Sequence, residues 1–284
     1  MTKNSVTIPA ILGRKNSPNK ITAVTATDFS FARIIEQTEI DIVLVGDSLA
    51  MVALGYENTL PVTLDEMLAH TRAVRRGVRS ALLVGDMPFM SYQVSVEKAV
   101  INAGRFIQEA GAQAVKLEGG IRVMDQVRAI VKAGIPVMGH IGLTPQSVHQ
   151  MGGYRVQGKT FLDARQIKQD ARELQNAGIF SLVLEGIPRE LAAEITQELK
   201  VPTIGIGAGP DCDGQILVLH DLVGLNTEFS PKFVKRFAEL AEEMQAAVTD
   251  YVEEVRSGKF PADKHSYHMA GHPLKPIKIN ASEK

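Results

Sequence analysis

Residues 95–119 read SVEKAVINAGRFIQEAGAQAVKLEG and contain one helix followed by one strand. The apolar residues of the first part recur three and four positions apart, which marks one face of a helix: Val96, Ala99, Val100, Ala103, Phe106, Ile107 and Ala110. Gly111 then supplies a left-handed helix cap. The run Ala114–Leu117 follows, and a short apolar run of this kind is typical of a strand buried on both faces.

The same helix-to-strand pattern recurs along the chain. Asp163–Ala177 is a second amphipathic segment that ends at a glycine, Gly178, and Thr63-Leu-Asp-Glu66 fits a capping box. Eight short apolar runs predict strands: Ile21–Ala26, Ile42–Val45, Ala81–Val84, Ala114–Leu117, Pro136–Met138, Ser181–Leu184, Thr203–Ile206 and Gln215–Leu219. The pattern predicts an α/β protein with a single (β/α)8 barrel of the TIM type, and a doubly wound open sheet is the alternative.

We expect residues 1–284 to form one barrel domain, with residues 1–20 as an N-terminal arm and residues 257–284 as a polar tail. A long amphipathic helix is predicted from Pro231 to about Arg256. The last two strands start at residues 203 and 215, which is too close for a helical crossover, so we expect a loop or a single turn there.

Composition excludes several classes of protein. The chain has 31 Lys and Arg against 32 Asp and Glu, so it lacks the basic surplus of a non-specific nucleic-acid binder. No apolar run approaches the length of a membrane span, and no secretory signal is visible at the N-terminus. The one cysteine, Cys212, has no partner for an internal disulfide. We therefore expect a cytoplasmic protein that binds neither nucleic acid nor membrane.

Five successive runs end in a polar residue beside a glycine: Asp47, Asp86, Glu118, His140 and Glu185. In a barrel these strand ends converge on one mouth, where catalytic groups lie. Asp47 and Asp86 facing one cavity repel each other unless a cation lies between them. Oxygen ligands without clustered cysteines favour Mg²⁺, with Glu118 as a third ligand or as the holder of a metal-bound water. The alternative is that each Asp caps the following helix or turn.

Three further residues are candidates for the chemistry. Lys116 shares a strand face with Glu118, so it is predicted either to clamp an anionic substrate or to form a plain ion pair. Glu185 follows an apolar run and suits a general base, although a cap or a salt bridge is the alternative. His140 is either structural or catalytic.

Other conspicuous residues are interpreted as structural. His149, His220 and Cys212 have no evident chemical partner. Gly205–Gly209 indicates close backbone packing first and ligand approach second, because Pro210 breaks a dinucleotide-binding fingerprint.

The chain resembles the ketopantoate hydroxymethyltransferase (3-methyl-2-oxobutanoate hydroxymethyltransferase) family from about residue 8 to the tail. The matching segments are Thr22–Asp28, Asp41–Thr63, Val84-Gly-Asp-Met-Pro-Phe89, Ala114-Val-Lys-Leu-Glu-Gly119, Val137-Met-Gly-His-Ile-Gly-Leu-Thr-Pro145, Leu184-Glu185 and Ile204–Gly224. The resemblance implies a (β/α)8 barrel, Mg²⁺, and transfer of a hydroxymethyl group from 5,10-methylenetetrahydrofolate to 3-methyl-2-oxobutanoate. The product would be 2-dehydropantoate, made through a Mg-stabilised enolate for pantothenate and coenzyme A synthesis.

The resemblance also implies roles for single residues. Asp47 and Asp86 would ligate the metal and so contact the substrate, and Glu118 would complete the metal surroundings. Ser48 and Lys116 would bind the keto acid, and Glu185 would accept the C3 proton. The resemblance implies a homo-oligomer, often a decamer.

Two alternatives to this function remain. One is a Mg²⁺-dependent lyase or mutase acting on 2-oxo acids, which would share the barrel and the carboxylates but would need no folate. The other is a metabolite-binding barrel without turnover. The fold alone does not decide between them, because barrels host many functions.

Overall fold

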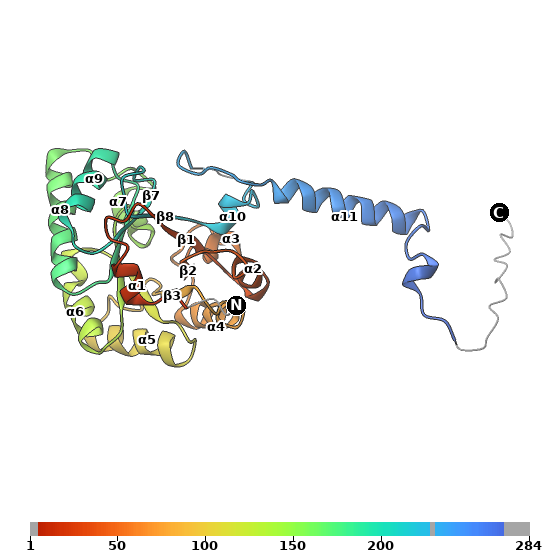
Figure 1. The fold of residues 1–284 in the computed structure, drawn as a ribbon, viewed down its shortest axis with the longest axis horizontal. Helices are drawn as coiled ribbons and strands as arrows, with labels where there is room; N and C mark the ends of the chain where they lie inside the picture. The colour runs from red at the N-terminus through yellow and green to blue at the C-terminus, as the bar shows by residue number, and fades with distance from the viewer. Residues whose placement is uncertain (1–4, 228–230, 270–284) are drawn as a thin grey trace. The chain divides into compact units, whose positions relative to one another are not determined.

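Eight parallel strands close into a barrel in the computed structural model, which describes residues 5–227 and 231–269 (Figure 1). Each strand pairs with its sequence neighbours, and β1 pairs with β8 to complete the ring. The predicted barrel is confirmed. The strands are β1 (Ile21–Thr25), β2 (Ile42–Val45), β3 (Leu82–Asp86), β4 (Ala114–Glu118), β5 (Val137–Gly142), β6 (Ser181–Glu185), β7 (Thr203–Ile206) and β8 (Gly214–Leu217).

Helices lie between most of the strands and begin at the expected capping residues. Thr63 and Glu66 form the capping box, and the Ser95 side chain accepts a hydrogen bond from the Lys98 N–H group at 3.2 Å. The helices in this part of the chain are α1 (Ile8–Leu12), α2 (Phe29–Ile35), α3 (Leu49–Val52), α4 (Leu64–Gly77), α5 (Val96–Gln108), α6 (Met124–Lys132), α7 (Val148–Met151), α8 (Phe161–Asn176), α9 (Arg189–Glu198) and α10 (Leu219–Leu222). The short 3₁₀ turns η1 (Ile121–Val123) and η2 (Pro145–Ser147) precede α6 and α7.

Four strands run past the apolar residues that predicted them. β3 includes Asp86, β4 includes Glu118, β5 includes His140, and β6 includes Glu185. Because the polar residues belong to the strands, the ladder hydrogen bonds fix their positions at the C-terminal mouth of the barrel.

The packing of α5 against β3 depends on a residue without a side chain. A Cβ atom on Gly85 would lie 2.4 Å from Cδ1 of Phe106, which is fully buried on α5. Gly85 therefore allows α5 to lie directly on the strand that carries Asp86.

The N-terminal arm packs against the opposite end of the barrel. Ile11 of α1 is buried with Ile21, Ile42, Leu82 and Ala114, which stand at the starts of their strands. Just after α1, Lys15 donates a hydrogen bond of 2.8 Å to Asp213, next to the start of β8. The arm thus covers the N-terminal end of the barrel.

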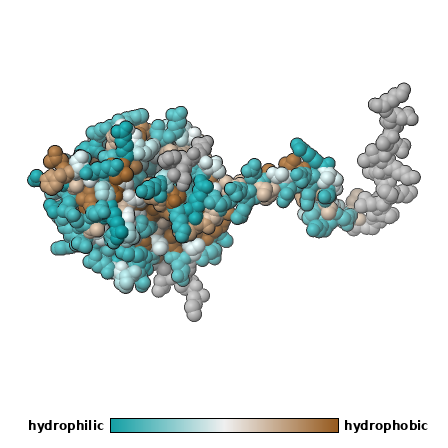
Figure 2. All heavy atoms as spheres, turned by 90° about the horizontal axis from the view of Figure 1, so that it is seen from above, coloured by the Kyte–Doolittle hydropathy of each residue, from teal (hydrophilic) through white to brown (hydrophobic). Residues whose placement is uncertain are grey.

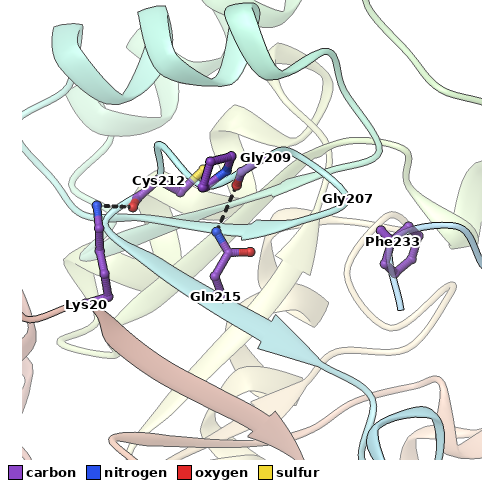
Figure 3. A pocket seen from close by; sticks show the side chains of 7 residues that line it. Lys20, Gly207, Gly209, Cys212, Gln215 and Phe233 are labelled. Carbon is purple, nitrogen blue, oxygen red and sulfur yellow. Dashed lines mark hydrogen bonds between the residues drawn. The ribbon is translucent and has the colours of Figure 1, made fainter. Parts of the chain in front are cut away.

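The link between β7 and β8 is a loop, as predicted, and it passes along a cavity of about 480 Å³ (Figure 3). Lys20 donates to the Cys212 carbonyl at 2.7 Å, and Gln215 donates to the Gly209 carbonyl at 2.9 Å. A Cβ atom on Gly207 would lie 2.8 Å from Phe233. The Phe233 side chain thus packs closely against this glycine-rich segment, which also borders the cavity.

The chain divides into two units, one up to Ala238 and one from Glu239. The second unit contains α11 (Leu240–Arg256) and the turn η3 (Asp263–His265). The predicted helix start at Pro231 is wrong, because the Phe237 N–H group donates to the Leu222 carbonyl instead of to a helical ladder. No residue of α11 is buried. Of the predicted tail, residues 270–284 lie outside the described residues.

The surface seen in Figure 2 is mostly hydrophilic, with scattered hydrophobic patches. Within the described ranges, no helix is long and apolar enough to cross a membrane.

Candidate active site

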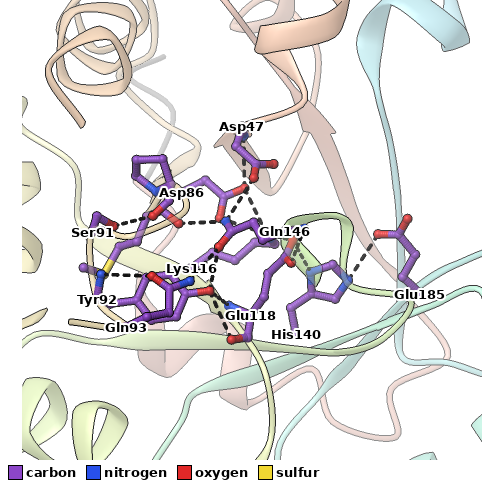
Figure 4. Close-up of polar contacts among 12 residues, drawn as sticks. Asp47, Asp86, Ser91, Tyr92, Gln93, Lys116, Glu118, His140, Gln146 and Glu185 are labelled. Atoms are coloured by element: carbon purple, nitrogen blue, oxygen red, sulfur yellow. Dashed lines mark hydrogen bonds and ion pairs between the residues drawn. The ribbon is translucent and has the colours of Figure 1, made fainter. Parts of the chain in front are cut away.

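Asp47 and Asp86 lie side by side in the barrel mouth and are both buried (Figure 4). Asp47 follows β2, and its backbone N–H group donates to Oδ2 of Asp86 at 3.1 Å. The Lys116 ammonium group donates to both oxygens of Asp86, at 2.8 and 2.9 Å. The strands thus bring together the two aspartates that the sequence predicted to share one cavity.

Lys116 and Glu118 face the same cavity from β4, as their spacing predicted. Lys116 Nζ lies 3.6 Å from Oε1 of Glu118, which is farther than its contacts with Asp86. The predicted ion pair is therefore present, with Asp86 as the closer partner. Both Lys116 and Glu118 are buried, which leaves the ammonium group as a fixed positive charge among carboxylates.

His140 connects two of the predicted site residues. Its Nδ1 atom lies 3.3 Å from Oε1 of Glu118, and its Nε2 atom lies 3.1 Å from Oε2 of Glu185. Burial acts to lower the pKa of His140, but the two carboxylates outweigh it and raise this pKa to about 9. A positively charged imidazole between the two acids would orient both of them.

Gln146 and Tyr92 are site residues that the sequence did not single out. The Gln146 side chain donates to Oδ2 of Asp47 at 2.9 Å, and its backbone N–H group donates to Oε2 of Glu118 at 3.0 Å. The Tyr92 hydroxyl donates to Oε1 of Gln146 at 2.7 Å. Gln146 directly follows the segment Val137–Pro145, which carries part of the family resemblance. This neighbourhood is the one feature of the sequence that could have indicated a place for Gln146 in the site.

Three more residues border the mouth. Ser48 is half-buried at the start of α3, and its side chain makes no capping hydrogen bond there. The Glu185 side chain is 17% exposed, so it is accessible from the mouth. Burial raises the pKa of Tyr154, and the carboxylates of Asp47, Glu185 and Glu118 raise it further. Tyr154 therefore belongs to the electrostatic surroundings of the site.

The remaining candidates lie apart from this cluster. His149 is exposed on α7, and His220 on α10 packs edge-on against Phe31 with ring centroids 5.4 Å apart. Cys212 is buried at the other end of the barrel wall, before β8. These placements agree with the structural roles that the sequence indicated.

Negative charge is in excess in the buried cluster. Burial raises the pKa of Asp47 well above its usual range, and repulsion from Asp86 and Glu118 adds to this effect. Burial also raises the pKa of Asp86, against the attraction of Lys116. For Glu118, Lys116 and His140 outweigh burial and lower the pKa. A further cation beside Asp47 and Asp86 would relieve this repulsion.

The donor chemistry fits Mg²⁺ with two protein ligands. Mg²⁺ takes one or two carboxylates and keeps several waters. Within residues 5–227 and 231–269, no three His, Cys, Asp or Glu side chains are grouped closely enough to form a metal site by themselves. Lys116 contacts both Asp86 and Glu118, so Glu118 borders the pair of aspartates.

A closed barrel of parallel strands with buried acids, a lysine and a histidine at its C-terminal mouth defines a (β/α)8 barrel enzyme. Solved structures share this fold. A phosphonopyruvate hydrolase in complex with oxalate and Mg²⁺ aligns with a TM-score of 0.60 at 13% identity, covering 91% of this chain and 92% of that one. A 2,3-dimethylmalate lyase of the PEP mutase/isocitrate lyase superfamily aligns with a TM-score of 0.59 at 17% identity, covering 92% and 88%.

Sequence comparison identifies the family. The family model described as ketopantoate hydroxymethyltransferase matches residues 5–263. A 3-methyl-2-oxobutanoate hydroxymethyltransferase from Pelobacter propionicus is 60% identical over 266 residues, which cover 94% of this chain and 98% of that protein. One from Moorella thermoacetica is 57% identical over 265 residues, covering 93% and 98%. The chain belongs to the ketopantoate hydroxymethyltransferase family and is a transferase.

Proposed function

We propose that the chain transfers a hydroxymethyl group from 5,10-methylenetetrahydrofolate to 3-methyl-2-oxobutanoate and forms 2-dehydropantoate for pantothenate and coenzyme A synthesis. The family membership supports the reaction, and the buried cluster in the barrel mouth supports the chemistry. One observation carries the proposal: Asp47, Asp86 and Lys116 form a buried cluster with Glu118, and His140 connects Glu118 to an accessible carboxylate, Glu185.

Asp47 and Asp86 would hold Mg²⁺, and Glu118 would border the ion through its contacts with Lys116 and Gln146. When bound, Mg²⁺ supplies a Lewis acid that stabilises negative charge on a substrate oxygen. The donor set supports this assignment, whereas the solved structures at 13–17% identity support the fold alone.

Lys116 binds the carboxylate of the keto acid in this proposal. Burial acts to lower the pKa of Lys116, but Asp86, Glu118 and Asp47 outweigh it, so the ammonium group stays charged. A charged, desolvated ammonium group binds a carboxylate strongly and holds it in one place. Ser48, half-buried beside Asp47, adds a hydroxyl group to the same wall.

Glu185 accepts the C3 proton of the keto acid. Its contact with His140 at 3.1 Å fixes the orientation of the carboxylate, and its exposed fraction leaves an oxygen accessible from the mouth. Loss of this proton gives the enolate of the keto acid. Its C3 atom forms a bond to the one-carbon unit while the bond between that carbon and one of its two folate nitrogens breaks, and this nitrogen takes up a proton. Water then breaks the remaining bond to the folate nitrogen, which leaves the hydroxymethyl group on C3 and releases tetrahydrofolate.

The test is product formation from 3-methyl-2-oxobutanoate with and without methylenetetrahydrofolate and Mg²⁺. The proposal expects 2-dehydropantoate only when all three are present. Cleavage or rearrangement of a 2-oxo acid without folate would favour the lyase or mutase alternative. Ligand binding without exchange of the C3 hydrogen would favour a non-catalytic barrel.

The cytoplasmic location, the homo-oligomer and the single barrel domain also remain proposals. Sedimentation or light scattering of the full chain measures the oligomer, for which the family resemblance implies a decamer.

A further inference from the structure

A second cavity, of about 450 Å³, opens beside the active site. Its walls come from the chain after β2, β3, β4 and β5, all at the C-terminal mouth of the barrel. Glu118 and Gln146 line it, and the same residues border Asp47 and His140. A molecule bound in this cavity would therefore touch the edge of the reaction centre.

Phe89 gives the cavity an aromatic wall, and the local backbone holds this residue in place. The Ser91 N–H and hydroxyl groups both donate to the Pro88 carbonyl, at 3.1 and 2.6 Å. Asn102 of α5 donates to the Ser91 carbonyl at 2.6 Å. Met90, which lies between Phe89 and Ser91, has a φ of 65°. This value is uncommon for a residue with a side chain and marks a constrained turn. Phe89 is 39% exposed, so its aromatic side chain is accessible for stacking.

Amide groups supply the polar part of the lining. Gln93 donates to Oε1 of Gln146 at 3.2 Å (Figure 4). Gln126 of α6 lines the same cavity. Asp47, Met87, Tyr92 and Gln93 saturate the Gln146 amide, so the donors and acceptors open to a ligand are those of Gln126 and the remaining N–H group and lone pair of Gln93. A flat heterocycle whose edge carries an amino group beside a ring nitrogen and a carbonyl matches such a lining.

Arg122 lies at the exposed side of the cavity. Its guanidinium group donates to the neutral amide of Gln150 at 2.7 Å. In the part of the chain that the structure describes, Arg122 forms no ion pair with a carboxylate, unlike Arg105, Arg172 and Arg189. An unpaired guanidinium at the rim is suited to an anionic group of a ligand.

We propose that this cavity binds the reduced folate, with the pteridine against Phe89 and the amides and the glutamate carboxylates at Arg122. This inference rests on the proposed function and assigns the folate a position within it. The volume lies in the usual range for small-molecule sites. The order of groups, from aromatic and amide near Gln146 to cation at the rim, follows the order of groups along the folate molecule.

The chain contains no tryptophan, which allows a direct binding assay. Phe89→Trp retains an aromatic face and places the sole tryptophan in the cavity wall. We expect tetrahydrofolate to quench its emission, and we expect Arg122→Ala in the same background to raise the dissociation constant about tenfold or more. Arg128→Ala is the matched control, because Arg128 is an exposed arginine on α6, the helix that directly follows the turn carrying Arg122, and it pairs with Glu173 at 3.9 Å. It should leave the dissociation constant unchanged.

Kinetics of the parent and of the single Arg122→Ala variant complete the test. We expect Arg122→Ala to raise KM for methylenetetrahydrofolate by a similar factor, with the rate of folate-independent C3 hydrogen exchange unchanged. Normal folate saturation of the Phe89→Trp enzyme without any change in emission would overturn the cavity assignment alone. An unchanged folate KM in Arg122→Ala would overturn it as well. If the parent makes no product with folate, the proposed function fails together with this inference.

Discussion

The Gln146 side chain donates a hydrogen bond of 2.9 Å to Oδ2 of Asp47, a residue 99 positions earlier in the chain. The same nitrogen donates to the Met87 carbonyl at 2.9 Å, and the Gln146 backbone holds Glu118. One neutral residue after β5 therefore fixes an acid from β2 and an acid from β4. This makes Gln146 a positioning residue for the proposed metal site.

Gln146→Glu replaces the donor with an acceptor while keeping the size of the side chain. Repulsion between the new carboxylate and Asp47 should lower kcat/KM by about 10- to 100-fold, as expected for the loss of a hydrogen bond to a charged group. The dependence of activity on Mg²⁺ concentration should also change. Gln166→Glu is the matched control, since Gln166 makes the analogous bond to Asp170 at an exposed position on α8. Equal effects of the two substitutions would contradict a positioning role.

Asp47→Asn and Asp86→Asn remove one charge each and keep the shape of the side chain. Either change should weaken Mg²⁺ binding, measured by titration calorimetry, and nearly abolish turnover. The thermal unfolding temperature of Asp47→Asn should not fall, because this substitution relieves repulsion in a buried cluster. Asp86→Asn also removes the partner of the buried Lys116 and should unfold at a lower temperature. Asp65→Asn, at an 81% exposed side chain, controls for the loss of a charge. Full activity of the parent in excess chelator would rule out the metal assignment.

Glu185→Gln keeps the packing but removes the proton acceptor. Exchange of the C3 hydrogen of 3-methyl-2-oxobutanoate in D₂O, followed by NMR without folate, should slow by about 10²- to 10⁴-fold. Glu190→Gln, at an exposed residue in the first turn of α9, should exchange as fast as the parent. If folded Glu185→Gln also exchanges at the parental rate, another group is the base, and His140 becomes the first candidate.

Gly85→Ala tests the packing beneath the site. The new methyl group would lie 2.4 Å from the Phe106 ring, so we expect a loss of about 1–3 kcal/mol of unfolding free energy in urea. In the double variant Gly85→Ala with Phe106→Leu, the loss of unfolding free energy should be smaller than the sum of the losses in the two single variants. Gly104→Ala on α5 meets nothing within 4 Å and should instead gain about 0.5–1 kcal/mol. If Gly104→Ala lowered the free energy of unfolding while Gly85→Ala left it unchanged, this account would be contradicted.

Asp213 should make the free energy of unfolding depend on pH. Burial acts to raise its pKa, but Lys15 and the N–H groups of Thr203 and Asn16 outweigh this effect and lower it. A carboxylate with a lowered pKa in the folded state stabilises the fold above about pH 4 and loses this contribution as the pH falls through the folded-state pKa.

Asp213→Asn should therefore be less stable than the parent at pH 7, and the difference between them should shrink below about pH 4. Urea unfolding at several pH values measures this difference. Asp211→Asn should show little effect at any pH, because its pairing with Arg189 is exposed. A constant difference between Asp213→Asn and the parent across the whole pH range would disprove the linkage.

The strands and the acids at their ends follow from local sequence. Runs such as Ala114–Leu117 and Ser181–Leu184 are short, apolar and bounded by turn residues, so both their type and their approximate limits could be predicted. Because the strands of the barrel are parallel, Asp47, Asp86 and Glu118 then lie at the same end of the barrel. The contacts of Lys116 with Glu118 follow from the two-residue repeat of a strand.

The hydrogen-bonded connections within the site could not be predicted in this way. Gln146 lies in the turn η2 and Tyr92 in the loop after β3. Their partners Asp47 and Glu118 come from distant parts of the chain, so no local pattern marks them. The same limit applies to the start of α11. An apolar stripe extends back to Phe233, but a tertiary hydrogen bond from Phe237 to Leu222 keeps this segment out of the helix.

The closure of the barrel between β1 and β8 has a consequence for synthesis of the chain. Lys15 and Asp213, which pair beside this closure, are 198 positions apart. While the ribosome is still making the middle of the protein, β1 has β2 on one side and a bare row of backbone N–H and C=O groups on the other. An open edge of this kind readily pairs with other chains. The nascent protein therefore passes through a long period of exposure to aggregation, which ends only when β8 emerges.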